Sequence, residues 1–400
     1  MTKPPSSWTP KTTIGKILLS PILEFIRDSR AVGITLIICT IVSLLLTNSG
    51  LSSTYLSFWD KEIHSPLPAL HLPHTILHWI NDGLMALFFF LVGLEIKREL
   101  TIGELSSLQK SMLPLFAALG GMLVPAALYF LINAGTPYER GWGIPMATDI
   151  AFSLGILSLL GSRVPFGLKV FLTALAIIDD LGGILTIAVF YTDTIHTPYL
   201  LVAAGIMALL LLLNRLKVQV MLLYYLPGIL LWYCILNSGI HATIAGVLLA
   251  FTIPLPRIEK LVHDLHDPVN FIIMPLFALA NTAIVLPAEW SSVFRSGINY
   301  GVLAGLCIGK PLGIATISFI AVQCKLGSLP DGVNWRHIIG AGIIAGIGFT
   351  MSIFIATLAF TDAEHQLIAK VAIMAASLLS GIAGFTFLVL QHRSGTANQS

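Results

Sequence analysis

The chain alternates long apolar stretches with short polar or proline-containing segments over most of its length. A helix that crosses a bilayer needs about 20 mostly apolar residues, and the pattern predicts twelve such spans. Six of them lie near residues 31–49, 77–101, 111–132, 137–160, 166–191 and 198–214. The other six lie near residues 219–236, 240–253, 261–285, 300–323, 337–360 and 367–391. The predicted fold class is therefore an all-α polytopic membrane protein of about twelve transmembrane helices, without a separate soluble domain.

Composition supports this prediction and excludes other classes of protein. Of the 400 residues, 56% are hydrophobic and 10% are charged, whereas ordinary soluble domains carry about 25% charged residues. The net charge of +2 is too small to indicate a nucleic-acid partner. The four cysteines are scattered without a CxxC spacing, so neither a disulfide framework nor a cysteine metal site is expected. No cofactor is predicted, and the expected surroundings are a lipid bilayer.

The distribution of Lys and Arg among the predicted loops gives the orientation. With the amino terminus in the cytoplasm, 17 of the 22 Lys and Arg residues lie on the cytoplasmic side and 4 outside, and Lys310 lies within a span. Cytoplasmic loops of membrane proteins carry such an excess. The first apolar run, 31–47, lacks a following cleavage motif, so an uncleaved first span is expected. Both termini are therefore predicted to be cytoplasmic.

Four ionisable residues fall near the middle of predicted spans. They are Asp149, the neighbours Asp179 and Asp180, and Lys310. A charge at the membrane centre costs about 2.5–3.5 kcal/mol on insertion scales, and such residues usually mark ion pathways. Structural salt bridges that hold the helices together are the alternative interpretation. The concentration of three carboxylates in two neighbouring spans favours an ion pathway.

The adjacent pair Asp179 and Asp180 is the most distinctive of these features. Neighbouring residues on a helix point about 100° apart, so the two side chains can border one hydrated cavity without sharing a direction. A carboxylate that holds either a proton or a small hard cation is the minimum needed to exchange the two. Oxygen ligands suit such cations, and the hydroxyls of Thr148 and Thr173 are candidate additional ligands. Binding of Na⁺ at the pair is expected to expel protons, and exchange is electrogenic if more than one leaves.

Two predicted spans contain helix-breaking residues. Pro145 precedes Asp149 in the fourth span, and proline interrupts helical hydrogen bonding. The eleventh span contains three closely spaced glycines, Gly342, Gly346 and Gly348. Unwound backbone at membrane depth survives only inside protein or beside water, and Asp149 is expected to neutralise half-helix N-termini while Lys310 neutralises C-termini. Close helix packing through the glycines is the alternative.

These motifs together resemble the NhaA-type sodium/proton antiporter family. The resemblance covers roughly residues 20–390. Seven segments in order carry it: 79–85 (WINDGLM), 93–99 (GLEIKRE), 147–153 (ATDIAFS), 176–180 (AIIDD), 239–243 (GIHAT), 308–313 (IGKPLG) and 346–352 (GIGFTMS).

The resemblance implies roles for the buried polar residues. Asp179 and Asp180 match the ion-binding and proton-exchanging pair, with Asp180 in direct contact with Na⁺ and Thr148 as a further ligand. Thr148 and Asp149 match the crossing segment of a discontinuous fourth helix. Lys310 matches a buried lysine that pairs with Asp179 and that is proposed to release a proton when sodium binds.

The resemblance also implies an architecture and a location. A single transporter domain over residues 1–400 contains inverted-topology repeats near 111–191 and 300–391, each with one discontinuous crossing helix. The outer loop, 50–76, resembles a β-hairpin through which the family forms homodimers. A bacterial inner membrane is the implied location, and Na⁺, Li⁺ and H⁺ are the implied transported ions.

A second set of residues matches family positions that are tied to the response to pH. These candidates are Glu95, Glu99, His241, His263 and His266. Histidine titrates near physiological pH, although a membrane histidine is often a hydrogen-bonded packing residue, and the glutamates are equally placed to pair with neighbouring cations. A glutamate expected before His263 is Val262 here, which puts the pH profile in doubt and leaves the transport chemistry unaffected.

Several functions were compared with Na⁺/H⁺ antiport. Sodium-coupled symport of an organic anion on a similar fold needs a second deep cation, and Lys310 is the only cation near the middle of a predicted span. An intramembrane protease needs a nucleophile and base or a metal motif, and neither GxSxG nor HExxH occurs. A passive cation channel is disfavoured because Lys310 would repel cations. The chain is therefore predicted to be a transporter and not an enzyme, with stoichiometry and ion preference left open.

Overall fold

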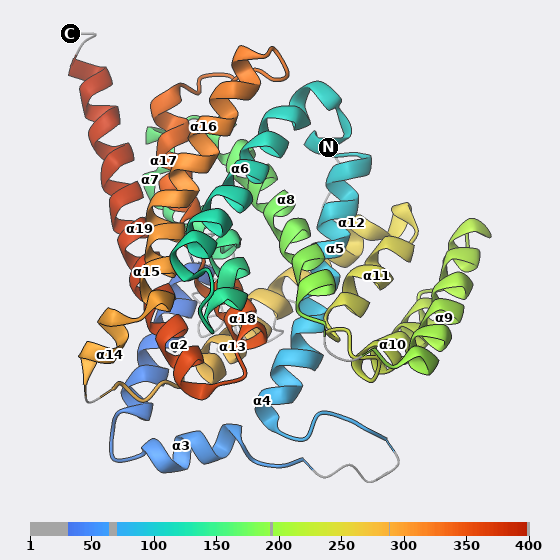
Figure 1. The fold of residues 1–400 in the computed structure, drawn as a ribbon. Coiled ribbons are helices and arrows are strands. Elements are labelled where there is room, and N and C mark those ends of the chain that lie inside the picture. Colours follow the sequence, from blue (N-terminus) through green and yellow to red (C-terminus); the bar gives the residue numbers. More distant parts are fainter. Residues whose placement is uncertain (1–30, 64–69, 193–194, 288, 398–400) are drawn as a thin grey trace, which may run out of the picture.

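The computed structural model describes residues 31–63, 70–192, 195–287 and 289–397. Within these residues every regular element is a helix, and the one β-type contact is an isolated antiparallel bridge between Glu62 and Thr75. The helices lie side by side in an elongated bundle (Figure 1). The predicted all-α class is confirmed.

The bundle is built from helices of very different length. The first half contains α2 (Ala31–Thr47), α3 (Ser52–Trp59), α4 (Ile76–His78), η1 (Trp79–Leu84), α5 (Met85–Thr101), η2 (Glu104–Ser106), α6 (Leu108–Asn133), η3 (Glu139–Met146), α7 (Ile150–Leu160), η4 (Gly161–Arg163), α8 (Phe166–Phe190) and α9 (Thr197–Arg215). The second half contains α10 (Leu222–Leu236), α11 (Ile244–Thr252), α12 (Leu255–Pro268), η5 (Val269–Ile273), α13 (Met274–Asn281), α14 (Trp290–Arg295), α15 (Gly297–Leu303), η6 (Ala304–Gly309), α16 (Lys310–Gln323), α17 (Trp335–Ala345), α18 (Phe349–Ala359) and α19 (Ala363–Ala397). Three of the η segments, η1, η5 and η6, are π-helical turns within longer helices.

Among the described residues, seven helices are long and apolar enough to cross a membrane, or nine if two bent pairs each count as one span. One bent pair is α2 with α3, at 119°, and the other is α17 with α18, at 48°. Helix α10 is apolar but only 15 residues long, and α11 has nine residues. The chain therefore has the helices of a multi-pass membrane protein, while the count of twelve stays a prediction.

Helices α6 and α16 cross in direct backbone contact. Gly120 of α6 and Gly313 of α16 face each other, and a Cβ added to either would collide with the backbone carbonyl of the other. A glycine at each position lets the two backbones touch, as small residues do between membrane helices. This contact holds Lys310, one turn before Gly313, next to the interior.

Two irregular backbone segments meet inside the bundle. Residues 147–149 are non-helical between η3 and α7, and residues 346–348 are non-helical between α17 and α18. The backbone N–H of Asp149 donates to the carbonyl of Ile347 across 2.7 Å. Each break thus supplies a partner for the other, so the unwound backbone is satisfied by protein.

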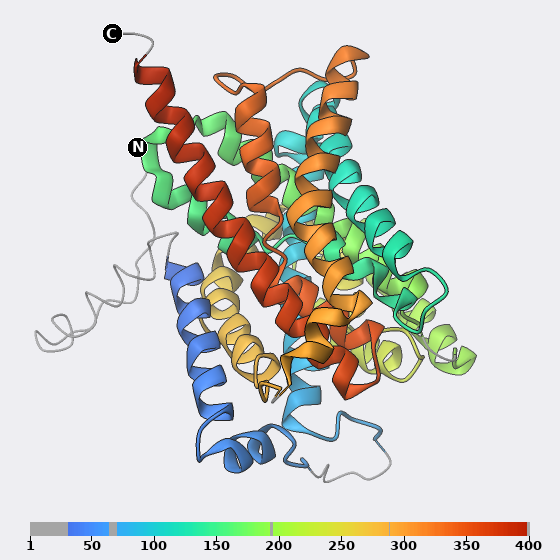
Figure 2. The same cartoon turned by 60° about the vertical axis from the view of Figure 1, so that its left-hand side comes forward.

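Helix α9 contributes little to the buried interior. Only 11% of its most apolar stretch is buried. The helix packs mainly beside α10 at one edge of the bundle (Figure 1). Helix α19 runs along another side (Figure 2).

Asp362 precedes α19 and accepts hydrogen bonds from the backbone N–H groups of His365 and Glu364, which lower the pKa of its carboxyl.

The outer loop has both helical and extended parts. Helix α3 follows the first span, and the Glu62–Thr75 bridge closes the base of the segment that leads to α4. Residues 64–69, at the tip of the predicted β-hairpin, lie outside the described residues. The hairpin and its role in a homodimer therefore stay predictions.

Candidate ion-binding site

Asp149 lies between the N-termini of two helices. Its side chain caps α7 by accepting a hydrogen bond from Phe152 N–H at 3.1 Å. The other carboxylate oxygen accepts hydrogen bonds from the backbone N–H of Thr350, at 3.1 Å, and from the Thr350 hydroxyl. Thr350 is in the first turn of α18. A negative group between two helix N-termini is electrostatically favourable, because both dipoles point their positive ends at it.

Lys310 lies at the opposite, negative ends of the interrupted helices. Its side chain is fully buried. The ammonium donates to the carbonyl of Met146, the last residue of η3, at 2.6 Å. It also donates to Asp179 Oδ2, at 2.9 Å, and to the Thr148 hydroxyl. An ammonium has three donors, and all three have partners here.

Thr148 joins this ion pair to the second break. Its hydroxyl lies 2.7 Å from Asp179 Oδ2 and 3.2 Å from the carbonyl of Ala345, the last residue of α17. The structure therefore brings Thr148, Asp179 and Lys310 into one hydrogen-bonded group. This group also contacts the carbonyl ends of η3 and α17.

Asp179 and Asp180 border a small internal cavity. Asp179 Oδ1 is buried and has no hydrogen-bond partner in the described part of the chain. Asp180 is 5% exposed and likewise makes no hydrogen bond or ion pair with a described residue. The volume of the cavity is about 10 Å³, which is close to the minimum needed to hold one water. The cavity is lined by Phe89, Ala147, Asp179, Asp180, Gly183, Ile184, Ile187, Met351, Phe354 and Ile355.

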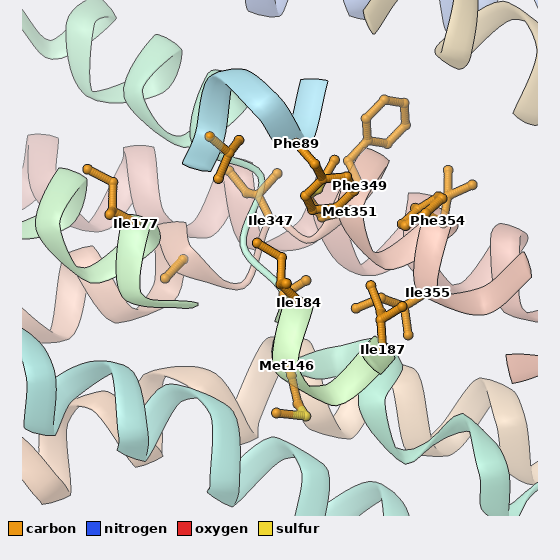
Figure 3. Packing of buried hydrophobic residues seen from close by; sticks show 14 of the residues in the cluster. Phe89, Met146, Ile177, Ile184, Ile187, Ile347, Phe349, Met351, Phe354 and Ile355 are labelled. Carbon is orange, nitrogen blue, oxygen red and sulfur yellow. The ribbon is translucent and has the colours of Figure 1, made fainter. Parts of the chain in front are cut away.

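Apolar side chains close the cavity on the remaining sides. Figure 3 shows Phe89 of α5, Ile184 and Ile187 of α8, and Phe354 and Ile355 of α18 gathered in the packed interior. A carboxylate in such surroundings loses most of its hydration, and burying an unpaired charge is costly. The cavity is therefore a place where a proton or a small cation would be held by carboxylate oxygens.

The charges near Asp180 are mostly negative. Asp179, Asp149 and Glu95 all interact electrostatically with Asp180, and Lys310 is the one cation among these interacting groups. Arg98 and His266 act on Glu95, so the ammonium of Lys310 would oppose three further negative charges if Asp149, Asp179 and Asp180 were all ionised. Protons or bound cations must offset the excess, because unpaired buried charges are strongly unfavourable.

The candidates for a pH response lie on three segments of the chain: α5, α12 and the turn before α11. Glu95 is half-buried and interacts with Arg98 and His266, while Glu99 forms an ion pair with Arg98 at 3.0 Å. His263 and His266 are on α12, with side chains 90% and 53% exposed. None of these four lies in the group around Lys310.

His241 belongs to a second polar cluster. Its Nε2 lies 3.5 Å from Asp82 Oδ1, and its Nδ1 lies 3.1 Å from the Thr243 hydroxyl. In the same region Asn281 donates to Asn81 across 2.9 Å. Asn81 and Asp82 are in the π-helical turn η1, and such turns are frequent at functional sites.

Two threonines differ from the sequence-based prediction of the site: Thr350 belongs to it and Thr173 does not. Thr350, which is not among the predicted site residues, donates a hydrogen bond to Asp149. The sequence feature that could have identified it is a hydroxyl side chain two residues after Gly348, at the predicted helix break. Thr173, a candidate ligand, instead donates to the Lys169 carbonyl of its own helix at 2.9 Å. A hydroxyl within a helix commonly bonds to the carbonyl four residues earlier.

The described residues contain no group of three or more His, Cys, Asp or Glu side chains arranged to hold a resident metal ion. The carboxylate oxygens at the cavity are few, and most of their neighbours are apolar.

Comparison with known proteins identifies extensive similarity. A family model described as Na+/H+ antiporter 1 matches residues 23–388. The Na(+)/H(+) antiporter NhaA 1 of Flavobacterium johnsoniae is 50% identical over 370 residues, covering 91% of this chain and 95% of that protein. The Na(+)/H(+) antiporter NhaA of Cytophaga hutchinsonii is 49% identical, covering 94% and 97%. The NhaA 2 protein of Clostridium beijerinckii is 44% identical, covering 98% and 100%.

Proposed function

Because this chain belongs to the Na+/H+ antiporter 1 family, we propose that it exchanges Na⁺ for H⁺ across a membrane by letting the two ions compete for the carboxylates of Asp179 and Asp180. The observation that carries the proposal is the shared cavity, where Asp180 and the free Oδ1 of Asp179 have no partner among the described residues. The family is one of transporters, not enzymes.

The exchange follows from the chemistry of these groups. When the cavity opens to a sodium-containing solution, Na⁺ binds Asp180 and Asp179 Oδ1, and the Thr148 hydroxyl, 2.7 Å from Asp179 Oδ2, is the candidate further ligand. The proton on Asp180 leaves as the cation arrives. Sodium at Asp179 also weakens the pull of that carboxylate on the Lys310 ammonium, so Lys310 is the candidate source of a second proton. Loss of two protons for one Na⁺ makes the exchange electrogenic, and Li⁺, also a small hard cation, is expected to substitute for Na⁺.

The meeting of the two helix breaks supports alternating access to this site. Asp149 neutralises the N-termini of α7 and α18, and Lys310 with Thr148 binds the carbonyl ends of η3 and α17. We propose that these are the two discontinuous helices of inverted repeats near residues 111–191 and 300–391, within twelve spans. The NhaA family is itself a standard example of this architecture, in which one repeat rocks against the other around a central site.

The remaining assignments extend this proposal. The excess of Lys and Arg in alternate loops supports a cytoplasmic location for both termini. A bacterial inner membrane is the location that fits a transporter driven by a proton gradient. A homodimer formed through the outer loop, 50–76, completes the proposed assembly.

Everted membrane vesicles with a pH-sensitive dye test the proposal. After respiration has acidified the interior, NaCl or LiCl should collapse the gradient in vesicles that hold the wild type. Asp180→Asn keeps the size of the side chain but cannot bind a cation through a negative charge, so it should give no response. Asp331→Asn, an exposed position in the loop before α17, serves as a matched control and should respond as the wild type does.

Three results would contradict the proposal in whole or in part. A folded, abundant wild type that gives no sodium response between about pH 6 and 9, the range around neutrality in which exchange is expected, would remove the antiport function. Sodium uptake that depends on an added organic anion, without proton movement, would favour the symporter instead. An undiminished response from Asp180→Asn would leave antiport in place and remove the assignment of the site.

A further inference from the structure

Two buried polar clusters lie close together without a polar connection among the described residues. One is the cavity of Asp179 and Asp180, whose side chains are nearly closed to solvent. The other is the pair of His241 and Asp82, whose side chains are 15% and 22% exposed. The second cluster is therefore less completely enclosed by protein than the first. What separates them decides whether an ion can pass from one to the other.

Phe354 contacts both clusters. Its side chain lines the aspartate cavity, and its ring packs edge-on against the His241 ring, with centroids 5.3 Å apart. Two further rings support it, those of Phe89 at 5.5 Å and Phe277 at 6.1 Å. Phe354 is only 1% exposed, so the ring is fixed on several sides.

The rest of the partition is also apolar. Phe89, Ile184 and Ile187 line the aspartate cavity and also line a narrow gap beside Thr243, the hydroxyl that contacts His241. That gap has no room for the centre of a water-sized sphere. The apolar barrier between the clusters is thus one side chain thick in places and closed to water.

The position of Phe354 links this barrier to the crossing of the broken helices. Phe354 is four residues after Thr350 on α18, and residues four apart lie on the same face of a helix. Thr350 binds Asp149. Any shift of α18 relative to Asp149 therefore moves the Phe354 ring relative to the cavity.

We propose that Phe354 is the gate between the aspartate cavity and the His241–Asp82 cluster, on the side of the membrane that the loop charges assign to the exterior. In the described conformation the ring blocks passage, and displacement of α18 withdraws it. This inference rests on the proposed function, because a gate has meaning only if the aspartates carry the transported ions. Its purpose is coupling: while one entrance is open, the ring keeps ions from leaking through the other.

Liposomes containing purified protein test the gate without sodium. A potassium gradient with valinomycin imposes a membrane potential, and an internal pH dye records proton entry. Wild type should be tight. Phe354→Ala, and the milder Phe354→Leu, should admit protons several-fold faster, because each opens a path for water beside Asp180. Phe277→Ala and Phe277→Leu are matched controls: they remove the same atoms from the same aromatic cluster, but Phe277 does not line the aspartate cavity.

The outcomes separate the gate from the function. If the Phe354 variants elute as folded protein and admit protons no faster than the wild type, the proposal that Phe354 is a gate is wrong. If the Phe277 variants leak equally, loosened packing explains the leak and the gate is again wrong. A wild type that fails to exchange Na⁺ for H⁺ in the same liposomes would contradict the proposed function itself, whatever the leak measurements give.

Discussion

The ammonium of Lys310 lies 2.9 Å from Asp179 Oδ2, and neither side chain has any exposed surface. The pair joins α16 to α8, and the same ammonium holds the carbonyl end of η3. Removing one partner from a buried ion pair leaves an uncompensated charge, whereas removing both charges together can be nearly neutral. The pair is therefore a structural connection as well as a candidate part of the transport chemistry.

Lys310→Gln should destabilise the protein by about 3–5 kcal/mol, the usual cost of breaking a buried pair from one side. The double variant Asp179→Asn/Lys310→Gln should recover much of that loss, because neither charge remains. Thermal unfolding in detergent, followed by size-exclusion chromatography, gives the comparison. If the double variant is less stable than either single variant, the two side chains do not act as a buried ion pair.

Asp149 should contribute more to stability than Thr350 does. Asp149→Ala removes the cap of α7, which alone costs about 1 kcal/mol, and it also removes the acceptor that neutralises α18. Thr350→Val keeps the shape of the side chain and the backbone N–H, and removes only the hydroxyl. The same unfolding assay should give a larger loss for Asp149→Ala. Equal losses would mean that Asp149 acts only through the hydroxyl of Thr350.

The sequence could indicate which residues are costly to bury, but not how they meet. Asp149, Asp179, Asp180 and Lys310 were identified because charges are rare at membrane depth. Their contacts depend on the crossing of two broken helices that are about 200 residues apart in the chain. Helical periodicity describes only residues that are close in sequence, so it cannot predict that Asp149 contacts α18. The expectation that Asp149 lies at a second helix N-terminus rests on the helix-dipole argument alone.

The boundaries and partners of the breaks were harder to predict. Pro145 lies inside η3 and not at the break itself, which begins two residues later. The carbonyls of Met146 and Ala345 are important acceptors, yet a backbone carbonyl is common to every residue and leaves no mark in a sequence. Short helices such as α11 were predicted as spans because apolar composition continues beyond the helix ends.

A larger side chain at the α6–α16 crossing should prevent these helices from meeting. Gly313→Val places its Cβ against the carbonyl of Gly120, and overpacking in a core typically costs about 1–3 kcal/mol or more. Gly205→Val on α9 is the control, because a Cβ there meets nothing within 4 Å. The yield of monodisperse protein and the unfolding temperature should both fall for Gly313→Val. Similar behaviour of the two variants would show that the crossing tolerates separation.

Gly183 offers a direct test of the cavity as a sodium site. It is buried and lines the cavity, and an added Cβ would meet no atom within 4 Å. The methyl group of Gly183→Ala should therefore enter a space of about 10 Å³ without displacing protein. Alanine also favours a helix over glycine by about 1 kcal/mol, so the variant should be at least as stable as the wild type.

The function of Gly183→Ala should change in the opposite direction to its stability. With less room beside Asp180, the sodium concentration for half-maximal exchange in vesicles should rise several-fold, and the smaller Li⁺ should be affected less than Na⁺. Gly205→Ala gains the same helix propensity far from the cavity, so it separates a stability effect from a binding effect. An unchanged sodium requirement in Gly183→Ala would mean that the cation binds outside this cavity, because a site of this size cannot hold both a new methyl group and the ion.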